Sequence, residues 1–215
     1  MGPSWLSRRP QGNRRGAATE DPNARAWLSK DAQLEPVLVE ALLEEETRPR
    51  SLRVGDSLLV ILRGVNLNPG ADPEDMVSVR LWLDAHRVIT IRDEKLLAIQ
   101  DIRDHCEAGH GPAGPGGFLA TLADRLIDRM APVLDQLSDG LDDLEEASLT
   151  APSADIRTGL ADLRRQTIAL RRHISPQKDA AQRLLTDAPP WLADTDRGRL
   201  RETADHVTEE VALDQ

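Results

Sequence analysis

The stretch "VSVRLWLDAHRVITIR", from Val77 to Arg92, sets the fold of this chain. Its first half alternates in polarity, and a β-strand places successive side chains on opposite faces. Four apolar residues therefore share one face and three residues share the other: Val77, Val79, Leu81 and Leu83 against Ser78, Arg80 and Trp82. A second β-rich run, "RVITIR", follows directly after Asp84-Ala85-His86. The stretch predicts a β-hairpin with one face on a core.

The residues around this hairpin predict an α/β unit over residues 23–110. Upstream, "SLLVILRGVN" (57–66) is another β-rich run, separated from the hairpin by the Pro/Gly-rich loop "LNPGADPED". Before that run, Asp21-Pro22 is a helix start signal and Leu38 and Leu42 have helical spacing, which predicts two short helices. Downstream, "KLLAIQDIRDHCEAG" predicts a helix that ends at Gly109.

A helical hairpin is predicted over residues 111–190, after the helix-breaking segment "HGPAGPGG". One apolar stripe recurs every three or four residues on a helix of about 30 residues: Leu119, Leu122, Leu126, Met130, Val133, Leu137, Leu141 and Leu144. A second helix, from about Ser153, carries its own stripe: Ile156, Leu160, Leu163, Thr167, Leu170 and Ile174. The two helices should pair antiparallel, with kinks at Pro132 and Pro176.

The two ends of the chain have a different character. Residues 1–22, which contain two Arg pairs and no apolar segment, predict a disordered arm. Residues 191–215 predict the start of a further amphipathic helix that the chain cuts short. No apolar run approaches the roughly 18 residues of a membrane helix, so we expect these 215 residues to be soluble by themselves.

The charge balance favours cations as partners. The net charge is -10, and a nucleic-acid-binding protein needs a basic face, so we expect no nucleic acid partner. Six carboxylates on the first long helix lie within about 60° of one another, opposite the leucines: Asp124, Asp128, Asp135, Asp139, Asp142 and Glu146. Carboxylate oxygens suit hard divalent ions such as Mg²⁺.

Four residues of this stripe are the predicted metal-binding residues: Asp135, Asp139, Asp142 and Glu146. The alternative is a solvated helix face, because one helix face cannot surround an ion. Three arginines at seven-residue intervals on the second helix, Arg157, Arg164 and Arg171, are expected to compensate part of this charge. Partner helices would decide between the two interpretations.

Other chemistry is poorly supported by the sequence. Cys106 and His110 stand four residues apart beside His105, but two ligands do not make a tetrahedral zinc site, and a helix end beside a loop is the alternative. The single cysteine excludes an internal disulfide. There is no nucleophile elbow and no phosphate-binding loop, so we expect the chain not to be an enzyme.

Several longer strings resemble the cytoplasmic domain of ZntB-type transporters, in the CorA superfamily of metal ion transporters. They are "ETRPR" (46–50), "VSVRLWLDAHRVITIR" (77–92), "LLAIQDIRDHCEAGHGPAGPGGFL" (96–119), "LRRQTIALRRHISPQKDAAQRLL" (163–185) and "PPWL" (189–192). The resemblance implies a homopentameric transporter of Zn²⁺ or a related divalent ion in a bacterial inner membrane. It also implies an α/β/α layered cytoplasmic domain with a mixed sheet, and a stalk helix that leads to two membrane helices per subunit.

In this family a Gly-x-Asn signature ends the first membrane helix. Gly64-Val65-Asn66 has that pattern, but it follows a predicted strand far upstream of any pore, so we interpret it as a strand end and loop. The sequence thus predicts a cytoplasmic regulatory and assembly domain of a ZntB-like transporter. The alternatives are a Mg²⁺ or Co²⁺ transporter domain, and a soluble protein-interaction module with no metal role.

Overall fold

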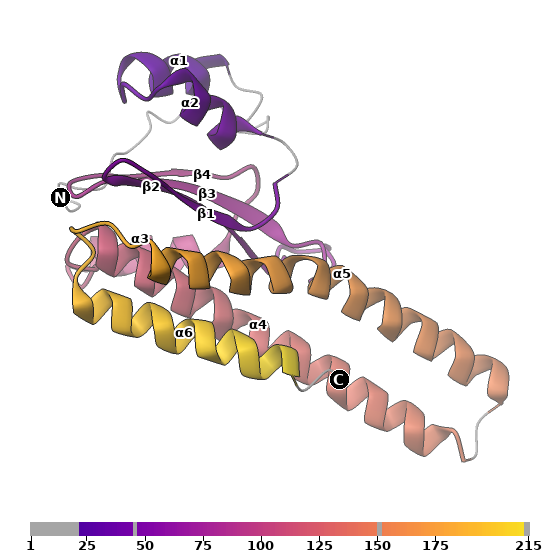
Figure 1. Ribbon diagram of the computed structural model, residues 1–215. Helices are drawn as coiled ribbons and strands as arrows, with labels where there is room; N and C mark the ends of the chain where they lie inside the picture. Colours follow the sequence, from indigo (N-terminus) through magenta and orange to yellow (C-terminus); the bar gives the residue numbers. More distant parts are fainter. Residues whose placement is uncertain (1–21, 45–46, 150–151, 213–215) are drawn as a thin grey trace.

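The computed structural model describes residues 22–44, 47–149 and 152–212, in three layers (Figure 1). Helices α1 (Pro22–Lys30) and α2 (Pro36–Leu43) cover one face of the sheet. The sheet contains β1 (Arg50–Val54), β2 (Ser57–Gly64), β3 (Val77–Leu83) and β4 (Val88–Ile91). The other face carries α3 (Leu97–Glu107), α4 (Pro115–Ala147), α5 (Ser153–Thr186) and α6 (Asp194–Ala212). The predicted α/β/α layering is confirmed, while the disordered arm predicted for residues 1–22 lies almost wholly outside the described residues.

The alternation of β3 divides the apolar core into two parts. Val79 and Leu81 are fully buried in a cluster that includes Leu119 and Leu122 of α4. Trp82 points to the opposite face and is buried with residues of α1 and α2. Burying one large apolar side chain contributes about 1.5–3 kcal/mol, so both helical layers are held to the sheet by many such contacts.

The described sheet is antiparallel throughout, in the order β1-β2-β3-β4, so the expectation of a mixed sheet is wrong for these strands. The physical reason is connectivity. No helix intervenes between successive strands, and each connection returns the chain beside the strand it has left. Strand β1 was not predicted from the sequence. Its connection to β2 turns at Gly55, which has a φ of +60°.

Gly64-Val65-Asn66 is a strand end and loop, as interpreted from the sequence. Gly64 is the last residue of β2, and the Asn66 backbone N–H donates to the Pro73 carbonyl at 3.1 Å. The buried Asn66 side chain accepts from the Asn68 amide and donates to Glu94 at 3.3 Å. The tripeptide therefore closes the loop between β2 and β3.

The long helices form the predicted antiparallel pair, and α6 lies along both of them. Pro132 and Pro176 lie inside α4 and α5, and neither proline ends its helix. Toward the far end of the pair, the packing relies on small residues. A Cβ placed on Gly140 would lie 3.3 Å from Leu163, and one on Gly159 would lie 2.7 Å from Leu144. Beyond the sheet, α4 and α5 continue together as a projecting hairpin (Figure 1).

We predict that Gly64→Ala destabilises the fold by about 1–3 kcal/mol, because overpacking a dense core forces side chains from their rotamers. The added Cβ would stand 2.6 Å from Leu126 Cδ2 and 2.9 Å from Leu96 Cδ1, both on buried leucines. Urea unfolding measures the change. Gly198→Ala is the matched control: it lies inside α6 with open space around it and should stabilise by about 0.4–1 kcal/mol. Equal effects at the two sites would contradict this account of Gly64.

Candidate functional site

The four predicted metal-binding residues all lie on the outer half of α4, beyond the sheet. Asp135, Asp139, Asp142 and Glu146 are exposed, and no ion pair joins any of them to another residue in the described ranges. Nor do the described residues contain a group of three or more His, Cys, Asp or Glu side chains able to hold a metal ion. One copy of the chain therefore offers a row of carboxylates, without a coordination shell.

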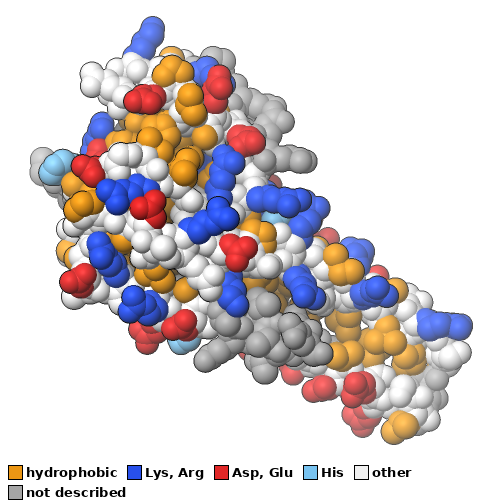
Figure 2. Space-filling view, viewed as in Figure 1, with side chains coloured by type: hydrophobic (Ala, Val, Ile, Leu, Met, Phe, Trp, Pro, Cys, Tyr) orange, Lys and Arg blue, Asp and Glu red, His pale blue; other side chains and the backbone are white. Residues whose placement is uncertain are grey.

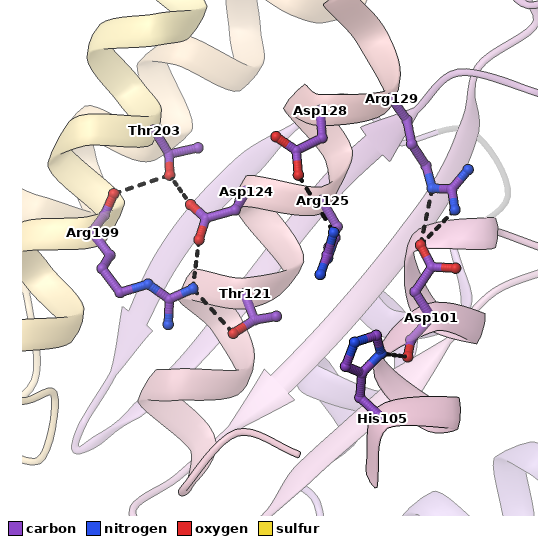
Figure 3. Close-up of polar contacts among 9 residues, drawn as sticks. All are labelled: Asp101, His105, Thr121, Asp124, Arg125, Asp128, Arg129, Arg199 and Thr203. Atoms are coloured by element: carbon purple, nitrogen blue, oxygen red, sulfur yellow. Dashed lines mark hydrogen bonds and ion pairs between the residues drawn. The ribbon is translucent and has the colours of Figure 1, made fainter. Parts of the chain in front are cut away.

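The inner end of the same stripe is neutralised within the chain. Asp124 accepts from Arg199 of α6 at 2.5 Å and also from the Thr203 hydroxyl, while Arg199 donates to Thr121 at 3.2 Å (Figure 3). Asp128 lies 3.7 Å from Arg125, one turn earlier on α4. The stripe thus splits into an inner part, in which Asp124 binds α6 and Asp128 pairs with Arg125, and an outer part that no described residue pairs with.

This contact between α4 and α6 was missed by the sequence analysis. Arg199 and Thr203 stand four residues apart, so they share one face of α6, and that spacing is the only signal that the sequence carries. Their partner Asp124 lies 75 residues before Arg199. Because Asp124 is only 34% exposed, its pairing positions α6 against α4 better than a fully solvated ion pair would.

The possible Cys106–His110 metal pair is not assembled. Cys106 is buried in the main core, whereas His110 is exposed beyond the end of α3, after Gly109 with φ of +85°. His105 instead lies 2.8 Å through Nδ1 from the backbone oxygen of Asp101, whose carboxylate accepts from Arg129 of α4 (Figure 3). The structure supports the alternative interpretation, a helix end beside a loop.

A small pocket of about 280 Å³ lies between α5 and the loop that precedes β3. His173 lines it beside Arg63, Arg172, Glu74 and Asp75. The His173 imidazole is buried, and its Nδ1 has no hydrogen-bond partner among the residues that the structure describes. Burial, reinforced by three guanidinium groups, lowers the pKa of His173 to about 4; these groups belong to Arg63, Arg172 and Arg48. His173 is therefore neutral at physiological pH.

The arrangement of these layers agrees with that of known proteins. A family model described as "CorA-like Mg2+ transporter protein" matches residues 17–214. The chain belongs to the CorA family. It is 41% identical over 189 residues to the divalent cation transporter CmaX of Pseudomonas aeruginosa, with 87% of this chain and 57% of CmaX aligned. It is also 36% identical over 186 residues to the zinc transport protein ZntB of Pectobacterium carotovorum, covering 86% of this chain and 57% of that protein.

Solved structures of relatives have the same fold. Full-length CmaX superposes with a TM-score of 0.82 and 39% identity, over 90% of this chain and 60% of CmaX. The ZntB cytoplasmic domain of Vibrio parahaemolyticus gives a TM-score of 0.72 with 27% identity, over 91% of this chain and 81% of that domain. This CorA-family chain is thus a ZntB-like domain, and its relatives are ion transporters rather than enzymes.

The chain spans 57% of the length of the full-length relatives it matches. No helix among the described residues has the length and apolar character needed to cross a bilayer.

We predict that Asp124→Asn loosens α6 and lowers the free energy of unfolding by about 1 kcal/mol, because it removes a partly buried, charge-assisted contact with Arg199. Hydrogen exchange in α6 and urea unfolding measure these effects. Asp128→Asn is the matched control, since its carboxylate is 63% exposed and 3.7 Å from Arg125, and it should change stability by less than about 0.5 kcal/mol. Unchanged exchange in α6 after Asp124→Asn would refute the positioning role.

We predict that His173 makes the domain less stable as the pH falls. Its folded-state pKa of about 4 is below the unfolded value of 6.5, so the unfolded chain binds the proton more readily between these values. The domain should lose about 2 kcal/mol from this group between about pH 7.5 and pH 5, and the effect should level off below pH 4. Urea unfolding of the wild type and of His173→Gln isolates it, because the variant lacks this titration; parallel pH profiles would contradict the prediction.

Proposed function

We propose that this chain is the cytoplasmic domain of a ZntB-like divalent cation transporter, on the cytoplasmic side of a bacterial inner membrane. In the assembled transporter, which we expect to be a homopentamer, its role is regulation and assembly. Segments beyond these residues would carry the membrane pore. The family match and the divalent cation transporters among its relatives support the transporter class.

The observation that carries the regulatory role is the uncompensated outer row on α4. Asp135, Asp139, Asp142 and Glu146 are all exposed on one helix face, with no ion pair from the described residues. Like charges held this close raise the local concentration of divalent cations. Ions that screen the row, or that lie between it and a neighbouring subunit, would complete a coordination shell that one copy lacks.

Helix α4 connects the carboxylate row to α6, so cation binding at the row can be coupled to the position of α6. Asp124, on the same face, holds Arg199 and Thr203 of α6, the last described helix. A cation that binds one arrangement of α4 and α6 more tightly than another shifts the population toward that arrangement. We propose that occupancy of the row is communicated in this way to the helix that leads onward in the longer relatives.

The ion that we favour is Zn²⁺, with Mg²⁺ as the competing choice. The zinc transport proteins among the relatives support zinc, whereas the family model carries the description of a Mg²⁺ transporter. The row contains carboxylates alone, and such oxygen ligands suit Mg²⁺ as well as Zn²⁺. The preference of this domain for Zn²⁺ or Mg²⁺ must therefore be measured by titration.

Calorimetric titration of the 215-residue chain with Zn²⁺ and with Mg²⁺ tests the proposal. We predict binding heats that disappear when the four carboxylates are neutralised together as Asp135→Asn, Asp139→Asn, Asp142→Asn and Glu146→Gln. The matched control, Asp155→Asn with Asp162→Asn on α5, should retain them because these exposed aspartates lie outside the row. Unchanged heats in the fourfold variant would reject a cation role for the row.

A further inference from the structure

The projecting hairpin separates its charges between two helices. The α4 segment 134–147 contains six acidic residues and no Lys or Arg, whereas the α5 segment 153–172 contains five arginines and two aspartates. Figure 2 shows the result on one face of the molecule: blue side chains follow the α5 edge of the hairpin, red side chains follow the α4 edge, and orange side chains lie between them. The hairpin has one basic edge and one acidic edge.

These charges do not neutralise one another within the chain. No ion pair joins the acidic segment of α4 to an arginine of α5 among the described residues; Arg165 pairs with Asp162 of its own helix at 3.7 Å. The α4–α5 contact here is made instead by leucines against Gly140 and Gly159. Arg157, Arg164 and Arg171 are all exposed, and among the described residues none of them forms an ion pair with the α4 stripe, so the expected compensation is not made by direct ion pairs within one copy.

Exposed apolar side chains accompany the arginines. Leu160 is 43% exposed and Ile168 is 58% exposed, and at 100° per residue both lie on the same side of α5 as the three arginines that follow the seven-residue spacing. Arginine interleaved with exposed apolar side chains is a combination found at protein interfaces. This mixed face is the basic docking face, formed by Arg157, Leu160, Arg164, Ile168 and Arg171.

The packing of the hairpin also fixes how the two edges align. Leu163 lies opposite Gly140, and Gly159 lies opposite Leu144. Counting along both antiparallel helices from these contacts, Arg164 stands at the level of Asp139, and Arg157 stands at the level of Glu146. A second copy placed alongside, with its hairpin parallel to the first, would therefore bring Arg157 and Arg164 each level with a carboxylate of its neighbour.

We propose that the basic docking face of one copy of this chain binds the α4 carboxylate row of a second copy, hairpin beside hairpin in parallel. Arg157 meets Glu146 and Arg164 meets Asp139, while Leu160 and Ile168 supply apolar contact. The pairing is head-to-tail, so the pair keeps one free acidic row on one copy and one free basic face on the other, and such an interface generates a closed ring when the rotation between copies permits. The inference rests on the proposed assembly role and requires no bound metal.

Charge reversal in the 215-residue chain, without divalent ions, tests this pairing. Sedimentation equilibrium should show self-association of the wild type that weakens as salt is raised. Reversing only the basic face (Arg157→Glu with Arg164→Glu), or only the acidic row (Asp139→Lys with Glu146→Lys), should weaken association by at least about tenfold, since like charges then meet. The control pair Arg25→Glu with Lys30→Glu, exposed on α1, makes the same change in net charge as the basic-face reversal and should leave association unchanged.

Mixing the two reversed variants decides the question. One then has two acidic faces and the other two basic faces, so they should associate with each other although neither associates with itself. A chain carrying all four reversals should also recover self-association. A wild type that stays monomeric at high concentration, or reversed variants that fail to combine, would overturn the proposal. Because divalent ions are absent throughout, unchanged cation heats in the fourfold variant of the titration would refute the proposed regulation and leave this result standing.

Discussion

Burial of the sheet on both faces is the constraint on which the rest of the structure depends. The alternation of β3 sends Val79 and Leu81 toward α4 and sends Trp82 toward α1 and α2. Each face must then be covered, because exposed apolar surface of that size destabilises a soluble domain. The first half of α4 buries its apolar stripe against the sheet, while its second half extends past the sheet and packs its leucines against α5. The separation between packing and charge along α4 follows directly.

The sequence predicted those elements whose pattern is produced by burial. Periodicity located β3 and the long helices, because a half-buried strand or helix must repeat its apolar residues on one face, and β-rich composition located β2 and β4. It failed for β1, a five-residue strand that contains two arginines and no fully buried residue. The direction of strand pairing was also predicted wrongly. The expectation of a mixed sheet came from the family resemblance, whereas the helix-free connections between successive strands give the antiparallel order β1-β2-β3-β4.

The candidate site shows the same limit at the level of single residues. Asp124 and Asp135 are the same residue type on the same face of one helix, and helical periodicity cannot distinguish them. The structure does, because Arg199 reaches Asp124 from α6 and no described residue reaches Asp135. Periodicity identifies which residues share a face. The neighbour that covers a face depends on tertiary packing, and here that neighbour is brought by a segment 75 residues downstream.

A shared set of carboxylates would connect the two proposals. Cations screening the α4 row and arginines from a second copy would both use Asp139 and Glu146, so each would reduce the affinity of the other by the same factor. Metal binding would then loosen contacts between hairpins, and docking would release metal. Because individual exposed ion pairs contribute at most about 1 kcal/mol, such a competition is easily reversed and is graded by ion concentration. A weak, uncompensated charge row is therefore better suited to sensing cations than a closed coordination site, which would hold its ion regardless of supply.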